Sequence, residues 1–289
     1  MLKKRIIAVL PVYNGIVVQS IGFHKYLPVG KAEIAIEFLN AWGIDEIVVA
    51  DITARKNQRV IQPGFIKQIS KKCLVPLTVG GGITRLEDVH GLIHSGADKV
   101  SVNNPVLTNP GLISEIAKNY GNQCVVASID ILRENNSLYV WDYTTKSRST
   151  QSVAQVLQTA IQAGAGELLI NSVHNDGKYT GYDTELFTEV CNQVTIPVLA
   201  CGGARNAESV IQLLKATDVS AACAGNFFHF FEHSVTITKK EIARHSDAIR
   251  IETAMNYKQN KVDAYGRLIK KEDTILEHLL YLKIEKEII

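Results

Sequence analysis

Short apolar runs rich in valine, isoleucine and leucine recur along the chain, and each is followed by a stretch with the periodicity of an amphipathic helix. Continuous apolar runs that alternate with helical segments are typical of parallel strands buried on both faces. Eight such runs occur, at residues 5–10, 46–51, 77–80, 99–103, 124–130, 167–171, 198–201 and 220–224. Eight strand–helix units in about 250 residues fit a closed barrel better than an open, doubly wound sheet. The pattern therefore predicts an α/β protein with a (β/α)8, or TIM-barrel, fold.

The two halves of the predicted barrel are similar in sequence. Residues 75–77 match residues 196–198, Gly81-Gly82 recurs as Gly202-Gly203, and Asp98 recurs as Asp218. These pairs are offset by 120 or 121 positions, which is half of a barrel. A duplication of four βα units explains the offset, and it predicts two similar ligand-binding edges.

Two segments depart from the strand–helix alternation. Residues 135–149 alternate polar and apolar positions, which predicts a small hairpin inserted after the fifth strand, over the barrel mouth. The barrel pattern ends near residue 252, so we divide the chain into a barrel at 1–252 and a helical C-terminal extension at 253–289. Within the extension, residues 271–288 have the periodicity of an amphipathic helix. That helix either packs on the outside of the barrel or forms a surface for a partner or a second copy.

Composition narrows the functional class. The chain is 46% hydrophobic and 21% charged with a net charge of +2, which favours neither nucleic acid nor a membrane as partner. No apolar stretch approaches the roughly 18–20 residues that span a bilayer. The five cysteines are scattered and form no CxxC pair, which argues against disulfides or a zinc site and for a reducing, cytoplasmic location. We expect no metal and no cofactor.

Glycine clusters end the third and seventh predicted strands, at residues 80–82 and 202–203. Glycine there lets backbone N–H groups approach an anion without a Cβ in the way. Each cluster neighbours a strand that ends in small or amide residues, at 103–104 and 224–226. A tight turn explains one such cluster equally well. Two clusters half a barrel apart predict an elongated or doubly phosphorylated ligand.

Side chains alternate between the two faces of a strand, so the parity of each run indicates which residues point into the barrel. At the carboxyl ends of the strands this places Asp130, Asn103, Asn171 and, on the following loop, Asp176 around the mouth. Asp130 ends an apolar run, and burial is expected to raise its pKa and suit it to acid–base chemistry. The alternative is a carboxylate that caps the loop behind it; its position favours the catalytic role.

The opposite end of the barrel carries four charges in the inward register. Arg5, Glu46, Lys99 and Glu167 begin the first, second, fourth and sixth predicted strands. They are either solvated charges that stabilise the barrel bottom or a ring of alternating cations and anions that satisfy one another. Such a ring would plug or gate a passage along the barrel axis.

Several segments are more specific than these patterns: residues 4–8 (KRIIA), 43–46 (GIDE), 51–54 (DITA), 78–83 (TVGGGI), 96–101 (GADKVS), 176–177 (DG) and 181–185 (GYDTE). Through them the chain resembles the HisF family, the cyclase subunits of imidazole glycerol phosphate synthase, from residue 1 to about residue 252. The resemblance implies a duplicated barrel, a glutaminase partner docked under it, and ammonia that passes along the axis to the opposite mouth.

The resemblance also implies roles for single residues. It implies that Arg5, Glu46, Lys99 and Glu167 form a salt-bridge gate and that Asp98 is a carboxylate at the glutaminase docking surface. Together with the patterns above, it defines an expected substrate- and phosphate-binding set: Gly82, Asn103, Asn104, Asn171, Asp176, Gly177, Gly203, Ala224 and Gly225.

One departure from the family is chemical. The family uses two aspartates, at the ends of strands one and five, as general acid and base. Asp130 fills the second place, but Pro11 stands in the first, and proline carries no group that could transfer a proton. In the flexible loop expected after strand one, Gln19 replaces the family's usual lysine. At the end of the sixth predicted strand, Asn171 replaces the family's threonine. The standard cyclisation is therefore in doubt.

Three hypotheses remain open. The first is a HisF-like synthase subunit that keeps the ammonia passage but serves another phosphorylated acceptor, as in HisF-like paralogues linked to amidino sugars of surface polysaccharides. The second is the cyclase of histidine biosynthesis, with His24 or Tyr13 in place of the missing aspartate. The third is a non-catalytic scaffold that activates or holds a glutaminase.

Overall fold

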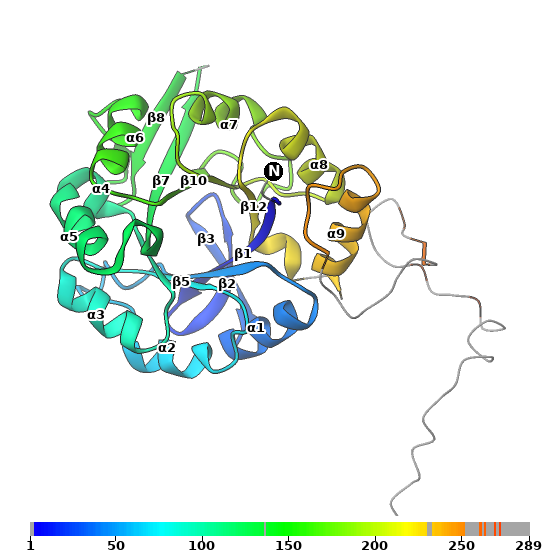
Figure 1. The fold of residues 1–289 in the computed structure, drawn as a ribbon, viewed down its shortest axis with the longest axis horizontal. Coiled ribbons are helices and arrows are strands. Elements are labelled where there is room, and N and C mark those ends of the chain that lie inside the picture. The colour runs from blue at the N-terminus through cyan, green and yellow to red at the C-terminus, as the bar shows by residue number, and fades with distance from the viewer. Residues whose placement is uncertain are drawn as a thin grey trace, which may run out of the picture.

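Eight parallel strands close into a barrel, and helices surround it (Figure 1). The computed structural model describes residues 3–135, 137–229 and 233–251 and the single residues 260, 261, 263, 269 and 272. Closure follows because β7 pairs with β10 and β12 pairs with β1. The barrel strands, in spatial order, are β1 (Arg5–Tyr13), β4 (Glu46–Asp51), β5 (Leu77–Gly80), β6 (Lys99–Val102), β7 (Val125–Glu134), β10 (Glu167–Ser172), β11 (Val198–Cys201) and β12 (Ala221–Ala224). The predicted (β/α)8 fold is confirmed.

The helices connect successive barrel strands and cover the barrel from outside. Several begin at side chains that satisfy free backbone donors: Ser152 accepts from the N–H of Gln155, and Asn206 accepts from that of Ser209. The helices are α1 (Ala32–Ala41), α2 (Pro63–Ser70), α3 (Leu86–His94), α4 (Asn104–Thr108), α5 (Pro110–Tyr120), α6 (Val153–Gln162), α7 (Thr184–Cys191), α8 (Ala207–Ala216) and α9 (Ser234–Ala243), with short 3-10 turns η1 (Asn122–Cys124) and η2 (Asn226–Phe228).

Strand alternation divides the apolar side chains between two cores. On β1, Ile6 and Leu10 face outward and pack under the helices, whereas Ile7 and Val9 face the barrel interior. The interior core is small and consists of the inward-facing residues Ile7, Val48, Val126, Leu169, Leu199, Ala221 and Cys223, with Val9 and Cys201 at its edge. An apolar zone thus lies inside the barrel, between its two ends.

Residues 16–30, where the family resemblance suggested a flexible loop, have regular secondary structure. They form two antiparallel strands, β2 (Ile16–Ile21) and β3 (Lys25–Gly30), that continue from the end of β1. Asn14 and Gly15, with φ of 49° and 83°, make the two-residue turn between Tyr13 and Ile16. An Asn-Gly pair with positive φ at both positions is the preferred type I′ hairpin turn. That dipeptide was the sequence signal for the hairpin.

The hairpin predicted at residues 135–149 is present. β7 extends beyond the barrel, and β8 (Ser137–Asp142) returns along it, with Val140 opposite Ile131. A short β9 (Ser147–Arg148) pairs with β8. In Figure 1, β8 projects past the ring of helices beside β7.

The prediction of a helical extension at 253–289, including the amphipathic helix at 271–288, lies outside the described residues apart from five isolated positions. Of the part of the chain that is described, no helix is long and apolar enough to cross a membrane.

Candidate functional site

The four charges predicted at the amino-terminal end of the barrel meet in a closed ring. Arg5 contacts Glu46 at 2.7 Å and Glu167 at 2.6 Å. Lys99 contacts the same two glutamates, at 3.0 Å and 2.7 Å. Each cation thus touches both anions, and each anion touches both cations. The sequence brought these residues to one end of the barrel, and the structure joins them in one network.

The two glutamates of the ring are largely shielded from water, so their charges need partners, whereas Arg5 and Lys99 keep part of their surface exposed. The Glu46 side chain is 2% exposed and also accepts a hydrogen bond from Thr78 Oγ1 at 2.9 Å. Burial by itself lowers the pKa of Arg5, but attraction to Glu167 and Glu46 outweighs it, so the net pKa is raised. A buried charge without a partner typically lowers the free energy of unfolding by an amount on the order of several kcal/mol. The four side chains thus form one ion-paired network at the amino-terminal end of the barrel.

Asp130 lies at the opposite end of the axis, held by two amide groups. Asn171 Nδ2 donates to one carboxylate oxygen at 2.8 Å, and Asn103 Nδ2 donates to the other at 3.0 Å. Asn171 lies directly across from Asp130 in the β7–β10 register and also donates to Ser128 Oγ. The structure therefore unites three predicted residues and adds Ser128, which the sequence analysis did not select.

Burial raises the pKa of Asp130 to about 6, although the hydrogen bonds from Asn171 and Asn103 act in the opposite direction. The carboxyl is 5% exposed, and desolvation disfavours its charged form. A carboxyl with such a pKa can both accept and return a proton near neutral pH. The predicted acid–base candidate thus has the expected electrostatics.

The place of the second family aspartate is occupied by a group without acid–base chemistry. Pro11 pairs with Ala50 of β4 near the end of β1 and is partly exposed. Tyr13 and His24, the two suggested substitutes for the aspartate, lie at the end of β1 and between β2 and β3 respectively. The Tyr13 ring contacts Tyr26, and His24 Nδ1 contacts the Gly22 carbonyl. Within the described residues, no hydrogen bond joins either of them to Asp130.

Asp176 fastens the β2–β3 hairpin to the loop after β10. Its carboxylate accepts from Ser20 Oγ at 2.7 Å and from the Phe23 N–H at 3.2 Å. Burial raises the pKa of Asp176, and these hydrogen bonds oppose the rise. The backbone of Gly177 passes close to the Ser20 carbonyl. Both residues, which stay predicted to face a ligand, contact the hairpin in this structure.

Asn226 belongs to the strand-end segment 224–226 noted in the sequence, but the sequence analysis did not include it in the predicted binding set. Its side chain donates to the Ser20 carbonyl at 2.7 Å and accepts from the Ser20 N–H at 3.2 Å. Gln19 adds a hydrogen bond to Tyr179 at 3.2 Å. The hairpin is therefore bound from two loops at once. The only local signal was the position of Asn226 in the small-residue segment after the last strand.

Gly82 and Gly203 are equivalent in the two halves, and their surroundings are equivalent too. Their φ values are +70° and +96°, and a Cβ at either position would overlap a backbone carbonyl, of Arg59 and Gly181 respectively. Each glycine thus permits a close approach of two βα loops as well as a positive φ. The duplication inferred from the sequence is visible in this local geometry.

The remaining predicted residues have simpler surroundings. The Asn104 side chain is buried and accepts from Thr108 Oγ1, so it does not join Asn103 at Asp130. Ala224 is buried at the end of β12, and Gly225 approaches the Val9 carbonyl. Asp98 is exposed at the amino-terminal end, where it accepts from the Leu77 N–H at 2.8 Å.

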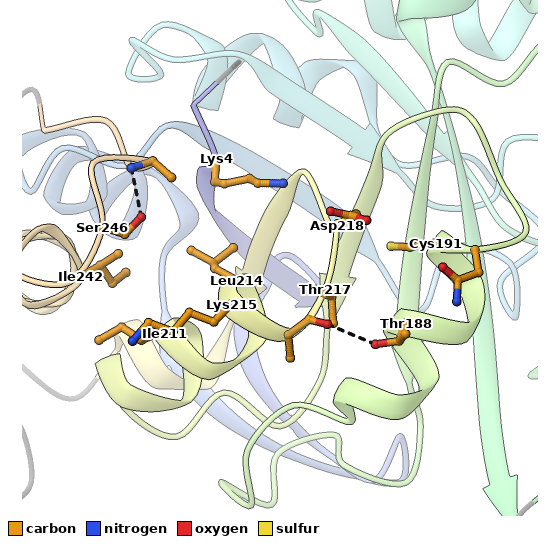
Figure 2. A pocket seen from close by; sticks show the side chains of 13 residues that line it. Lys4, Thr188, Cys191, Ile211, Leu214, Lys215, Thr217, Asp218, Ile242 and Ser246 are labelled. Atoms are coloured by element: carbon orange, nitrogen blue, oxygen red, sulfur yellow. Dashed lines mark hydrogen bonds between the residues drawn. The ribbon is translucent and has the colours of Figure 1, made fainter.

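A cavity of about 300 Å³ opens at the same end as the ring, among α7, α8 and the chain after α9 (Figure 2). Lys4 and Asp218, which precede β1 and β12, both line it. Lys4 Nζ donates to the Val219 carbonyl at 2.6 Å. Asp218 is the half-barrel counterpart of Asp98, so both carboxylates lie on this end of the molecule.

Fold and site together define a class of protein: a duplicated (β/α)8 barrel with an ion-paired ring at one end of its axis and a buried carboxyl at the other. A family model described as histidine biosynthesis protein matches residues 5–234. The chain belongs to the HisF family of imidazole glycerol phosphate synthase subunits.

Three relatives illustrate the relationship. A putative imidazole glycerol phosphate synthase subunit, hisF2, of Vibrio vulnificus is 36% identical over 267 residues, covering 92% of this chain and 98% of that protein. The HisF subunit of Dehalococcoides mccartyi is 38% identical over 253 residues, covering 87% of this chain and 100% of that protein. That of Streptococcus mutans is 35% identical over 251 residues, covering 86% and 100%.

Proposed function

We propose that this chain is the synthase subunit of a glutamine amidotransferase complex. It receives ammonia from a glutaminase partner at the end that carries the charged ring and Asp98, conducts it along the barrel axis, and delivers it to a phosphorylated acceptor at the mouth. The closed ring of Arg5, Glu46, Lys99 and Glu167 is the observation that carries the proposal. A barrel bottom that only needed solubility would expose such charges rather than bury and pair them.

The zone between ring and mouth suits neutral ammonia. Most of its side chains are apolar, among them Ile7, Val48 and Leu169, and the Ser128 hydroxyl lies at its upper end, where it accepts a hydrogen bond from Asn171. Moving a neutral polar molecule from water into such surroundings costs on the order of a few kcal/mol, whereas moving an ion costs far more. The interior therefore favours ammonia over ammonium. Passage requires one cation of the ring to swing away from a glutamate, which docking of a partner could drive.

At the mouth, Asp130 removes a proton from the nitrogen that ammonia contributes. Asn103 and Asn171 fix both carboxylate oxygens, which leaves the group oriented toward one acceptor. The acceptor is not the family's usual one, because Pro11 cannot complete the acid–base pair. We assign it to the phosphorylated sugars that receive an amidino group in surface-polysaccharide synthesis.

A second candidate is the cyclase of histidine biosynthesis with an altered site. The names of the relatives in three bacteria support it. It needs a substitute for the missing aspartate, and a movement of the β2–β3 hairpin would have to bring His24 or Tyr13 to the mouth. The hydrogen bonds that Asp176 and Asn226 make to the hairpin oppose that movement.

The two candidates are separated by an assay with ammonium salt and the ribonucleotide substrate of the histidine-pathway cyclase. The Dehalococcoides mccartyi subunit serves as the positive control. We expect no imidazole glycerol phosphate from this chain under conditions in which the control turns over. Turnover comparable with the control would contradict the proposed change of acceptor. A chain that stimulates a glutaminase but transfers ammonia to no phosphorylated sugar would be a scaffold.

A further inference from the structure

A strongly cationic cleft lies at the carboxyl-terminal end of the barrel, beside the mouth. Its volume is about 690 Å³, and it separates the β4–α2 loop from the start of α3. Small-molecule sites occupy roughly 300–1,000 Å³. Four cations line the cleft against one carboxylate: Arg55, Lys56, Arg59 and Arg85 against Asp88. Gly82 also lines the cleft, and it is the one lining residue that belongs to the predicted phosphate-binding set.

Two of the four cations already have partners. Arg59 contacts Asp51 at 2.7 Å, and Arg85 contacts Asp88 at 3.2 Å. In the described parts of the chain, no carboxylate lies within ion-pair distance of Arg55 or Lys56, and both side chains are exposed to the cleft's solvent. The cleft therefore keeps an excess of positive charge that neighbouring side chains do not neutralise.

The loop that carries Arg55 and Lys56 is held in one conformation. The buried carboxylate of Asp51 accepts from the N–H and the hydroxyl of Thr53, at 2.9 Å and 2.7 Å. The Arg59 guanidinium closes the loop through Asp51, and its backbone N–H donates to the Ala54 carbonyl at 3.0 Å. A pre-organised loop loses less conformational entropy when it binds a ligand.

Two backbone donors at the start of α3 are already in use. Asp88 accepts from the N–H of Thr84 at 3.0 Å and from that of Arg85 at 3.2 Å. The guanidinium and ammonium groups are the charged donors that the cleft offers to a ligand. Arginine guanidinium groups suit phosphate oxygens because they donate two parallel hydrogen bonds.

The cleft and the mouth lie at the same end of the barrel. Gly82 lines the cleft and belongs to the turn that follows β5, and Asp130 lies on β7 at the carboxyl ends of the barrel strands. A ligand anchored in the cleft is therefore bound at the end of the barrel that carries the buried carboxyl.

We propose that the cleft binds a diphosphate group, and that Arg55 and Lys56 are its specific ligands. The excess of cations matches a group with several negative charges, and the volume exceeds what a single phosphate fills. The existence of the anion site does not depend on the proposed function. The statement that the bound diphosphate belongs to the ammonia acceptor does rest on the proposed function. The acceptor would then be a diphosphate-containing compound such as a nucleotide-activated sugar.

Isothermal titration of the full chain with inorganic pyrophosphate at low salt tests the anion site. We expect one saturable site, and roughly tenfold or more weaker binding in an Arg55→Gln/Lys56→Gln variant, because two charge-assisted contacts are lost. An Arg244→Gln/Lys118→Gln variant removes the same charge from exposed positions on α5 and after α9, and it should bind within about twofold of the unchanged chain. Both pairs are exposed, so circular dichroism should show folded proteins.

Equal weakening in the two double variants would overturn the site, because it would show general electrostatic attraction. Undiminished binding in the Arg55→Gln/Lys56→Gln variant would also overturn it and would place pyrophosphate at the glycine edges instead. If pyrophosphate binds as expected but no acceptor is aminated, the anion site stands and the proposed function fails. If amination proceeds with the same acceptor KM in the cleft variant, the acceptor assignment fails and the proposed function stands.

Discussion

Asp130 and Pro11 define the chemistry at the scale of single residues. Asp130 is a buried carboxyl with a pKa of about 6 that two asparagines hold by both oxygens. Pro11, at the end of β1, has no proton to give or take. One carboxyl without a titratable partner can deprotonate an incoming nucleophile, but it cannot protonate a leaving group at the same time. The mouth therefore suits a reaction that needs a single base.

The raised pKa of Asp130 predicts a pH dependence of folding stability. Its folded pKa of about 6 lies above the ordinary value of 3.8, so the fold favours the protonated form. The stabilising contribution is complete below about pH 4 and is lost as the pH rises through about 6, a change of about 3 kcal/mol. Urea unfolding of the unchanged chain and of Asp130→Asn, measured from pH 4 to pH 8, should show the free energies of unfolding diverging by that amount. Parallel pH profiles would contradict the prediction.

Pro11→Asp tests how much of the family's acid–base chemistry depends on this one position. Restoring the second carboxyl should raise ammonia-dependent cyclase turnover by about 10²–10⁴-fold if nothing else has changed, which is the usual contribution of a general acid or base. We expect a much smaller gain, because Gln19 and Asn171 also differ from the family pattern. A full gain, measured as imidazole glycerol phosphate formed, would show that the substrate site is otherwise intact.

At the scale of elements, the β2–β3 hairpin is the structure most relevant to access. It continues β1, and side chains from the loops after β10 and β12 bind it: Asp176 through Ser20, and Asn226 through both backbone groups of Ser20. In Figure 1 both strands appear within the outline of the barrel. These hydrogen bonds add to the burial of Val17 and Val18 on β2, whereas β3 is mostly exposed or half-buried.

Asn226→Ala should release the hairpin. The loss of two hydrogen bonds to Ser20 is expected to favour opening by about 1–3 kcal/mol, which is roughly five- to 150-fold. Hydrogen exchange at the amides of residues 16–30 would measure the change. The control is Asn119→Ala on the barrel exterior, whose side chain contacts only the Glu115 carbonyl among the described residues. Equal exchange in both variants would mean that Asn226 does not hold the hairpin.

α9 is attached to the barrel by a buried ion pair. Lys239, 1% exposed, donates to the Gly43 carbonyl at 2.6 Å and contacts Asp45 at 2.6 Å. Lys239→Met leaves the buried Asp45 carboxylate without its cation, so we expect a loss of about 3–5 kcal/mol in the free energy of unfolding. Lys118→Met, at an exposed position of α5, is the control and should change stability by less than about 0.5 kcal/mol. Denaturant unfolding monitors both.

At the scale of the whole molecule, the functional groups follow the barrel axis. The ring of four charges lies at the amino ends of the strands, the apolar interior lies in the middle, and Asp130 lies at the carboxyl ends. The cationic cleft adjoins the mouth. Under the proposed function, ammonia enters at one end of the barrel and the acceptor binds at the other.

Lys99→Ala tests this arrangement in the complex with a glutaminase. Lys99 contacts both glutamates of the ring, so its loss opens the ring and unbalances its charge. We expect glutamine-dependent amination to fall several times more than amination supplied with external ammonium salt. The control is Lys118→Ala, away from the axis. Equal effects on the two activities would count against passage through the barrel.

Much of the site was predictable because it depends on local periodicity. The ring residues each begin an apolar run in the inward register, so strand parity alone placed them together. The same rule placed Asp130, Asn103 and Asn171 at the mouth. Parity could not show that Asp176 and Gly177 contact the hairpin, because those contacts link positions more than 150 residues apart.

The sequence by itself determined the barrel, its duplication, the membership of the ring and the presence of Pro11 where the family has an aspartate. The first three follow from residue identity and from the two-residue period of a strand, and the last follows from the resemblance to the family. Only the tertiary structure decided that the four ring residues pair with one another and that Asn226 binds the hairpin. It also decided that burial raises the pKa of Asp130 to about 6 and that Arg55 and Lys56 line an open cleft. These properties depend on which distant groups pair and which are excluded from water, and neither is encoded in any single stretch of the chain.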